Sequence, residues 1–171
     1  MAIILVGFMA SGKTSVGQIL AKFLNLPWID LDKKIEKDIG MPIHKFFEEF
    51  GEDSFRVKES QLLFEELKKD IVLSTGGGVV IRKKNRKAII KKSNCRIYLA
   101  SSFSVLIKRI RQNKKNIRPL AINSSYKELK KLFEERKIWY KEIATLTIQT
   151  AKQSSTIVAK EIMQGIGKSW K

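Results

Sequence analysis

The eight residues from Gly7 to Thr14, GFMASGKT, restrict the possible folds of this chain more than any other segment. They follow the pattern G-x-x-x-x-G-K-T, in which glycines let the backbone curl so that its N–H groups surround a phosphate. The lysine of this pattern reaches the β- and γ-phosphates of a nucleotide, and the threonine hydroxyl can bind Mg²⁺. The apolar run Ile3–Phe8 leads into the loop, and apolar residues at helical spacing follow it within Thr14–Leu24. A strand, a glycine loop and a helix in this order predict an anion site; a glycine turn without a ligand is the alternative.

Apolar runs typical of strands recur along the chain and alternate with segments of helical periodicity. The five runs are Ile3–Phe8, Trp28–Leu31, Ile71–Ser74, Arg96–Ala100 and Thr145–Thr150. The periodic segments are Thr14–Leu24, Ile43–Phe50, Phe55–Leu67, Phe103–Ile110, Tyr126–Tyr140 and a last one from the N-cap Ser154 to about Met163. This alternation predicts an α/β fold, a parallel sheet with helices on both faces. A length of 171 residues fits one such domain, 1–171.

The composition narrows the possible function classes. The single cysteine, Cys95, excludes a disulfide within the chain, suits a reducing cytoplasm and is expected to be a buried strand residue. No apolar run approaches the roughly 20 residues of a membrane span, and the apolar start of the chain lacks the basic leader of a signal peptide. The net charge is +17, but the lysines are spread over helices, so we interpret them mainly as solvated side chains. Attraction of anionic substrates and nucleic-acid binding remain alternatives.

Acidic residues and glycines follow two further strands, at the sheet edge where ligands bind in such folds. Asp30 and Asp32 end the second strand two residues apart, so we expect both carboxylates on one side of the extended chain. One would help to hold hydrated Mg²⁺, and the other would accept the proton of a substrate hydroxyl; capping of the next helix is the alternative. The segment Thr75–Gly78 follows the third strand, and its three glycines can expose N–H groups to an anionic substrate. A flexible turn is the alternative there.

Two arginines stand out in a chain that otherwise prefers lysine. Arg56 and Arg136 carry the planar fork that binds a carboxylate in a bidentate manner. Together with the triple glycine they predict a small substrate that has both a carboxylate and a hydroxyl, although a helical arginine can also be simply solvated. Arg118 lies in the long polar segment 112–125, which is a candidate lid or else a solvated connector.

These residues together resemble the shikimate kinase family, from about Ile3 to Ile162. The resemblance implies a three-layer P-loop kinase fold with a five-stranded parallel sheet in the order 2-3-1-4-5. It also implies a shikimate-binding helical section at about 32–62 and a mobile lid at about 112–125. The implied reaction is phosphorylation of the 3-hydroxyl of shikimate with ATP and Mg²⁺, in the chorismate pathway of aromatic amino acid biosynthesis. We expect a cytoplasmic monomer that binds shikimate and no membrane or specific nucleic acid.

The resemblance implies roles for individual residues. The catalytic residues would be Lys13, Asp32 and Arg118. The substrate would be bound by Asp32, Phe47, Phe55, Arg56, Gly77, Gly78 and Arg136. The nucleotide would be bound by Ala10, Ser11, Gly12, Lys13, Thr14, Ser15, Arg109, Arg118 and Gln153. The metal would be bound by Thr14 and, through water, by Asp30.

Two positions depart from the family pattern without changing the chemistry. Ala10 stands where a glycine is common, and Ala121 follows Arg-Pro-Leu where a second leucine is usual. The lone histidine, His44, has no partner for a metal site. Three rival functions stay open: another small-metabolite kinase (a gluconate or nucleoside-monophosphate kinase), a P-loop protein that binds nucleic acid, and a kinase-like binding module. An assay of ADP release with and without shikimate discriminates among them.

Overall fold

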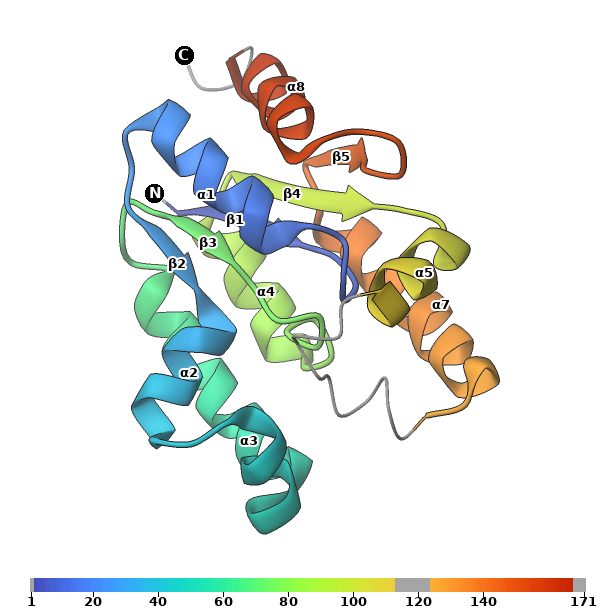
Figure 1. Cartoon of the computed structure of the whole chain (residues 1–171). Helices are drawn as coiled ribbons and strands as arrows, with labels where there is room; N and C mark the ends of the chain where they lie inside the picture. The colour runs from blue at the N-terminus through green and yellow to red at the C-terminus, as the bar shows by residue number, and fades with distance from the viewer. Residues whose placement is uncertain (1, 113–123, 168–171) are drawn as a thin grey trace.

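The computed structural model describes residues 2–112 and 124–167, and in these ranges five parallel strands form one sheet in the order β2-β3-β1-β4-β5 (Figure 1). The strands are β1 (Ile3–Val6), β2 (Trp28–Asp30), β3 (Val72–Ser74), β4 (Cys95–Ala100) and β5 (Leu146–Gln149). The central strand β1 pairs with β3 on one side and with β4 on the other. The predicted parallel sheet and its order are confirmed.

Helices cover both faces of the sheet and make three layers (Figure 1). The first face carries α1 (Lys13–Leu24) and α8 (Ser155–Gly167), which pack against each other. The opposite face carries α3 (Ile43–Glu66), α4 (Lys83–Lys92) and α7 (Tyr126–Ile143), and α2 (Leu31–Ile39) and α5 (Phe103–Gln112) lie at its ends. The side chains of β1 alternate between the two layers. Ile3 and Leu5 join the core under α1 and α8, whereas Ile4 and Val6 join the larger core on the other face.

Two helices, α2 and α4, have no counterpart among the periodic segments. In α4 the sequence KKNRKAIIKK offers three apolar residues, of which only Ile89 is fully buried. In α2 the buried residues are Leu31 and Ile35, one turn apart. Patterns this short are weak sequence signals, because packing rather than propensity stabilises most short helices. The two segments predicted at 43–50 and 55–67 form one element with a kink at Gly51, whose φ of 77° suits glycine.

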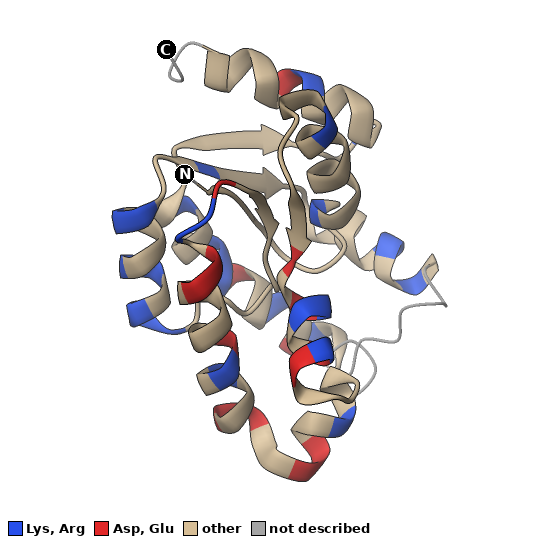
Figure 2. Cartoon of the chain, turned by 90° about the vertical axis from the view of Figure 1, so that its left-hand side faces the viewer, with Lys and Arg blue, Asp and Glu red and all other residues tan. Residues whose placement is uncertain are grey.

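The charged side chains are distributed over many elements, with acidic residues among the basic ones (Figure 2). In α4 the lysines at 83, 84, 87, 91 and 92 are all exposed. This arrangement agrees with the interpretation of most lysines as solvated side chains. No helix in the described part of the chain combines the length and the apolar character needed to span a bilayer.

Cys95 begins β4 and is only 5% exposed, as expected for a buried strand residue. Burial raises the pKa of its thiol to about 11, so the group stays protonated at neutral pH. The predicted lid lies almost entirely outside the described residues, and Arg118 and Ala121 lie outside them as well.

Candidate active site

The loop between β1 and α1 has the curled backbone that its sequence predicts. Gly7 has φ 151° and Gly12 has φ 96°, and a Cβ on Gly7 would approach the Leu99 carbonyl oxygen to 2.8 Å. Ala10 adopts φ 60°, the left-handed conformation in which a side chain costs about 1–2 kcal/mol. This conformation explains why glycine is common at that position. Lys13 then starts α1, so the positive end of the helix faces the loop.

Lys13 is folded over the loop. Its Nζ donates to the carbonyl oxygens of Gly7 at 2.8 Å and Phe8 at 2.9 Å. The residue as a whole is 8% exposed. A cation held by backbone carbonyls at the centre of an anion-binding loop is placed to contact phosphate oxygens. Thr14 adds a hydroxyl at the same place, and its Oγ1 donates to Asp30 Oδ2 at 2.8 Å.

The two aspartates reach this edge of the sheet, but not as predicted. Strand β2 ends at Asp30, and Asp32 lies in the first turn of α2, so the expectation that both extend from one strand is wrong. Asp30 caps α2 by accepting from the Lys33 N–H at 3.3 Å, which is the capping alternative, while its other oxygen binds Thr14. The carboxylate of Asp32 packs against Gly76, where any Cβ would overlap Asp32 Oδ1.

The substrate residues implied by the resemblance share one cavity of about 320 Å³. Its walls include Asp32, Phe47, Phe55, Arg56, Gly77, Gly78 and Arg136. Five residues that were not predicted also line it, namely Met9, Ile43, His44, Glu48 and Glu59, together with Gly76 of the predicted triple-glycine segment. Phe47 and Phe55 pack ring against ring, with centroids 4.7 Å apart, and form an apolar wall. Arg56 and Arg136 therefore face a common hollow beside Gly78.

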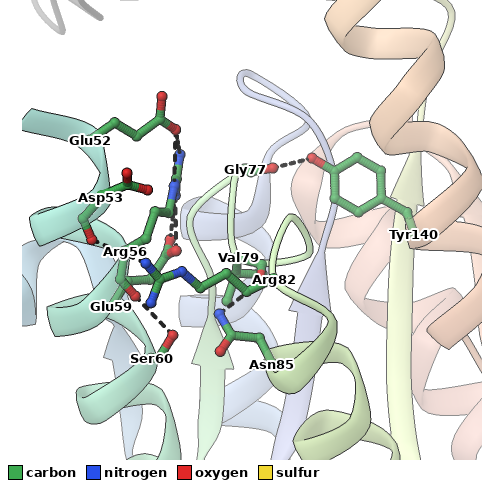
Figure 3. Close-up of polar contacts among 10 residues, drawn as sticks. All are labelled: Glu52, Asp53, Arg56, Glu59, Ser60, Gly77, Val79, Arg82, Asn85 and Tyr140. Atoms are coloured by element: carbon green, nitrogen blue, oxygen red, sulfur yellow. Dashed lines mark hydrogen bonds and ion pairs between the residues drawn. The ribbon is translucent and has the colours of Figure 1, made fainter.

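Arg56 is held by two acidic residues of its own helix, α3 (Figure 3). Its Nε and Nη2 donate to Glu52 Oε1 at 3.1 and 2.8 Å, and its Nη1 donates to both oxygens of Glu59 at 3.0 and 2.9 Å. Burial alone would lower the pKa of Arg56, but the attraction of Glu59 and Glu52 outweighs it and the pKa is raised. The flat guanidinium lies against Gly78, where a Cβ would come within 2.6 Å of Arg56 Cζ.

Arg136 is the second cation of the cavity and differs from Arg56 in its lack of acidic partners among the described residues. It is 3% exposed, its Nε has no hydrogen-bond partner, and within the described chain it makes no ion pair. Burial lowers its pKa, and the nearby positive charge of Arg56 lowers it further, against the attraction of Tyr140. A buried guanidinium in this state is a ready partner for an incoming carboxylate.

Among the residues that sequence reasoning missed, Glu59 and Tyr140 hold other parts of the site in place. Glu59 is 1% exposed, and burial raises its pKa against the attraction of Arg56. Its position three residues after Arg56 on a helix was the available signal. Tyr140 is fully buried and its hydroxyl donates to the Gly77 carbonyl, which fixes the triple-glycine segment (Figure 3). No local pattern in the sequence connects Tyr140 with Gly77, because the two residues are 63 positions apart.

A methyl group at Gly78 tests this packing. We expect Gly78→Ala to displace the Arg56 guanidinium and to raise the KM for a carboxylate substrate by about tenfold or more, since small misplacements in a site have large effects. The KM for the nucleotide should stay within about twofold. Steady-state kinetics measure both, with Gly167→Ala as the control because its Cβ would meet open space. Equal changes in both KM values would contradict this packing.

A second cavity of about 300 Å³ lies on the other side of the loop. It is lined by Ala10, Ser11, Gly12, Val16, Arg109, Thr150, Gln153, Ser154, Ser155 and Val158. The predicted nucleotide residues Arg109 and Gln153 are therefore brought to the loop from distant segments. Arg109 donates to the Thr150 and Ala10 carbonyl oxygens at 2.5 and 3.3 Å, and Gln153 donates to Glu161 at 2.8 Å. Met9 lines the first cavity and Ala10 the second, so the loop separates the two.

A metal ion would find only a partial set of ligands here. In the described ranges no three His, Cys, Asp or Glu residues gather as a metal cluster. The oxygens of Thr14 and Asp30, which lie 2.8 Å apart, fit Mg²⁺, because this ion keeps several waters and takes one or two protein oxygens beside substrate phosphates.

A phosphate loop between two cavities, on a parallel sheet in the order 2-3-1-4-5, defines a P-loop kinase that acts on a small molecule. The shikimate kinase family model matches residues 9–167. The chain is 45% identical to a shikimate kinase from Enterococcus faecalis over 163 residues, which cover 95% of this chain and 96% of that one. It is 42% identical to a shikimate kinase from Streptococcus thermophilus, over 95% of this chain and 98% of the relative. The chain belongs to the shikimate kinase family.

Solved structures support the same assignment. The structure of shikimate kinase from Acinetobacter baumannii in complex with shikimate matches with a TM-score of 0.91 and 33% identity, over 98% of this chain and 93% of that one. A gluconokinase from Sinorhizobium meliloti matches with a TM-score of 0.63 and only 18% identity, which shows a shared fold alone.

Proposed function

We propose that this chain transfers the γ-phosphoryl group of ATP to the 3-hydroxyl of shikimate and releases shikimate 3-phosphate and ADP. Membership of the family supports ATP-dependent transfer to a hydroxyl of shikimate. One structural observation carries the proposal: Arg56 and Arg136 face the same hollow as Asp32, directly beside the phosphate loop. A small hydroxy acid held by its carboxylate would place a hydroxyl near that loop.

In a phosphoryl transfer, the site residues would bind the substrate, orient the reacting hydroxyl and stabilise the developing charge. Arg136 and Arg56 would hold the carboxylate, with the N–H groups around Gly78 and the apolar wall of Phe47 and Phe55 beside the ring. Asp32 would orient the reacting hydroxyl and accept its proton. These contacts make the attack nearly unimolecular, which is a large part of enzymatic rate enhancement.

The nucleotide would occupy the second cavity, with Arg109 and Gln153 near the base and the loop from Ala10 to Ser15 around the phosphates. Lys13 would stabilise the charge that develops on the transferring group. Thr14 and, through water, Asp30 would hold Mg²⁺, which would supply positive charge for the phosphates. Arg118 of the inferred lid would complete the charge clamp; it lies outside the described residues.

We also propose an oligomeric state, a compartment and a domain organisation for the protein. We infer a cytoplasmic monomer, as the resemblance to the family implies. We infer a single domain, 1–171, with a shikimate-binding section at about 32–62 and a lid at about 112–125. Size-exclusion chromatography with light scattering tests the monomer.

A coupled assay tests the proposed reaction. Purified protein with ATP and Mg²⁺ should release ADP only when shikimate is added, and a chelator of Mg²⁺ should stop the release. Gluconate and nucleoside monophosphates, offered in place of shikimate, are the control acceptors. ADP release that is independent of shikimate, or faster with a control acceptor, would refute the proposal.

The variant Arg56→Lys tests the carboxylate clamp. Lysine keeps the charge but not the planar fork, so we expect the KM for shikimate to rise by about tenfold to a hundredfold, the value of a charge-assisted hydrogen bond. The KM for ATP should change by less than about twofold. Steady-state kinetics with each substrate varied in turn would expose a clamp that does not exist, because both KM values would then change alike.

A further inference from the structure

All three nitrogens of the Arg56 guanidinium already donate to acidic residues in the free protein (Figure 3). Nε and Nη2 share Glu52 Oε1, and Nη1 binds the two oxygens of Glu59. A substrate carboxylate that binds this fork in a bidentate manner must therefore replace one of the two partners.

Glu52 and Glu59 differ sharply in their surroundings. The side chain of Glu59 is 1% exposed, whereas that of Glu52 is 50% exposed. Release of Glu59 would leave a buried charge without a partner, which is strongly unfavourable. Release of Glu52 would return its carboxylate to water. Glu52 also follows the kink at Gly51, in the first turn of the second half of α3, where the helix dipole stabilises a free carboxylate.

The contact with Glu52 also determines which way the fork faces. Arg56 and Glu59 line the substrate cavity, but Glu52 does not. Glu52 therefore holds the edge of the guanidinium formed by Nε and Nη2 away from the cavity, and a carboxylate in the cavity can bind this edge only after Glu52 is released and the guanidinium turns. That edge is one of the two that can hold a carboxylate through parallel N–H groups.

The other arginine of the cavity is in the opposite state. Arg56 has two acidic partners, whereas the described residues offer Arg136 no ion pair and leave its buried Nε without an acceptor. An incoming carboxylate therefore gains more by binding at Arg136, whose charge is not yet paired within the described residues, than by binding at Arg56. Arg56 can contribute fully only after its outer edge is released.

We infer that Glu52 is a built-in competitor of the substrate carboxylate. It holds the outer edge of Arg56 in the free protein and gives it up when an acid group binds at Arg136. This inference rests on the proposed function, because it takes Arg56 and Arg136 as the binding site of the shikimate carboxylate. Glu52 is a positioning residue that lowers the affinity for substrate and touches no reacting atom.

The variant Glu52→Gln removes the competing charge and keeps the size of the side chain. We expect the Kd for shikimate, measured by calorimetry without nucleotide, and the KM for shikimate to fall about two- to fivefold, the range of an exposed ion pair. The kcat and the KM for ATP should stay within about twofold. The melting temperature of the free protein should fall, while its increase on addition of shikimate should become larger.

Two controls separate competition from a general change of charge. Asp53→Asn removes the same charge one residue later, at a side chain that makes no hydrogen bond to Arg56, and should leave the Kd for shikimate unchanged. The methyl ester of shikimate carries no negative charge, so Glu52→Gln should not improve its binding.

The outcomes are distinct. A Kd for shikimate that is unchanged or raised in Glu52→Gln overturns the inference, because Glu52 would then orient Arg56 rather than compete for it. An equal gain in Asp53→Asn, or an equal gain for the ester, overturns it too. Failure of the proposed function is seen in the wild-type protein alone, as the absence of ADP release that depends on shikimate.

Discussion

Replacement of Lys13 by alanine is expected to reduce kcat by on the order of 10³-fold, the upper range for loss of one preorganised donor to a transition state. Nζ of Lys13 lies at the centre of the loop, bound to the carbonyl oxygens of Gly7 and Phe8. No other described basic side chain bonds to these oxygens. The release of ADP from ATP and shikimate measures the loss.

The control variants for Lys13 separate lost chemistry from lost folding. Lys13→Met keeps most of the packing volume and should be as inactive as Lys13→Ala. Lys22→Ala, in the last turn of the same helix and exposed, should be fully active. Circular dichroism should show the same helix content in all three variants. Normal turnover in Lys13→Met would remove this residue from the mechanism.

Arg136→Met is expected to raise the KM for shikimate by about a hundredfold, because the lost contact is a buried, charge-assisted pair. Its KM for ATP should change by less than about twofold. The same variant should melt at a higher temperature than the wild type when no ligand is present. The reason is that Arg136 is buried and has no acidic partner among the described residues, so its charge destabilises the empty site.

Steady-state kinetics measure the two KM values of Arg136→Met, and thermal unfolding with and without shikimate measures its melting temperature. The stabilisation by shikimate should disappear in this variant, while stabilisation by the nucleotide should remain. Lys141→Met, at an exposed position of the same helix, is the control and should resemble the wild type. A lower melting temperature together with an unchanged KM for shikimate would show that Arg136 serves the fold and not the substrate.

The sequence predicts the parts of this protein that depend on local rules. The loop from Gly7 to Thr14 requires glycine at fixed positions and a helix directly after it, so its residues and its position in the fold could be identified together. The sheet order came from resemblance to a family, because the alternation of strands and helices leaves the order of strands open. The clustering of Arg56, Arg136 and Gly78 around one cavity likewise became testable only in the folded chain.

The sequence failed where contacts between distant segments decide the structure. Asp32 lines the expected cavity, yet from a helix and not from a strand, because α2 begins at Leu31 and has too few apolar residues to be recognised. Tyr140 holds the Gly77 carbonyl from a helix far along the chain. Glu52 and Glu59 lie four residues before and three residues after Arg56, which is the usual spacing of solvated ion pairs on a helix. Only their unequal burial in the folded chain distinguishes their roles.

The lone thiol of Cys95 gives this enzyme a practical advantage for spectroscopy. With its protonated sulfur enclosed in β4, the wild-type chain should react slowly with maleimide reagents. A fluorescent or spin probe can then be attached at one introduced cysteine, such as Ile138→Cys at a side chain that is 67% exposed, without first deleting the native one. The signal of such a probe would report how its surroundings change during turnover, and a second introduced cysteine would allow a distance between two probes to be measured.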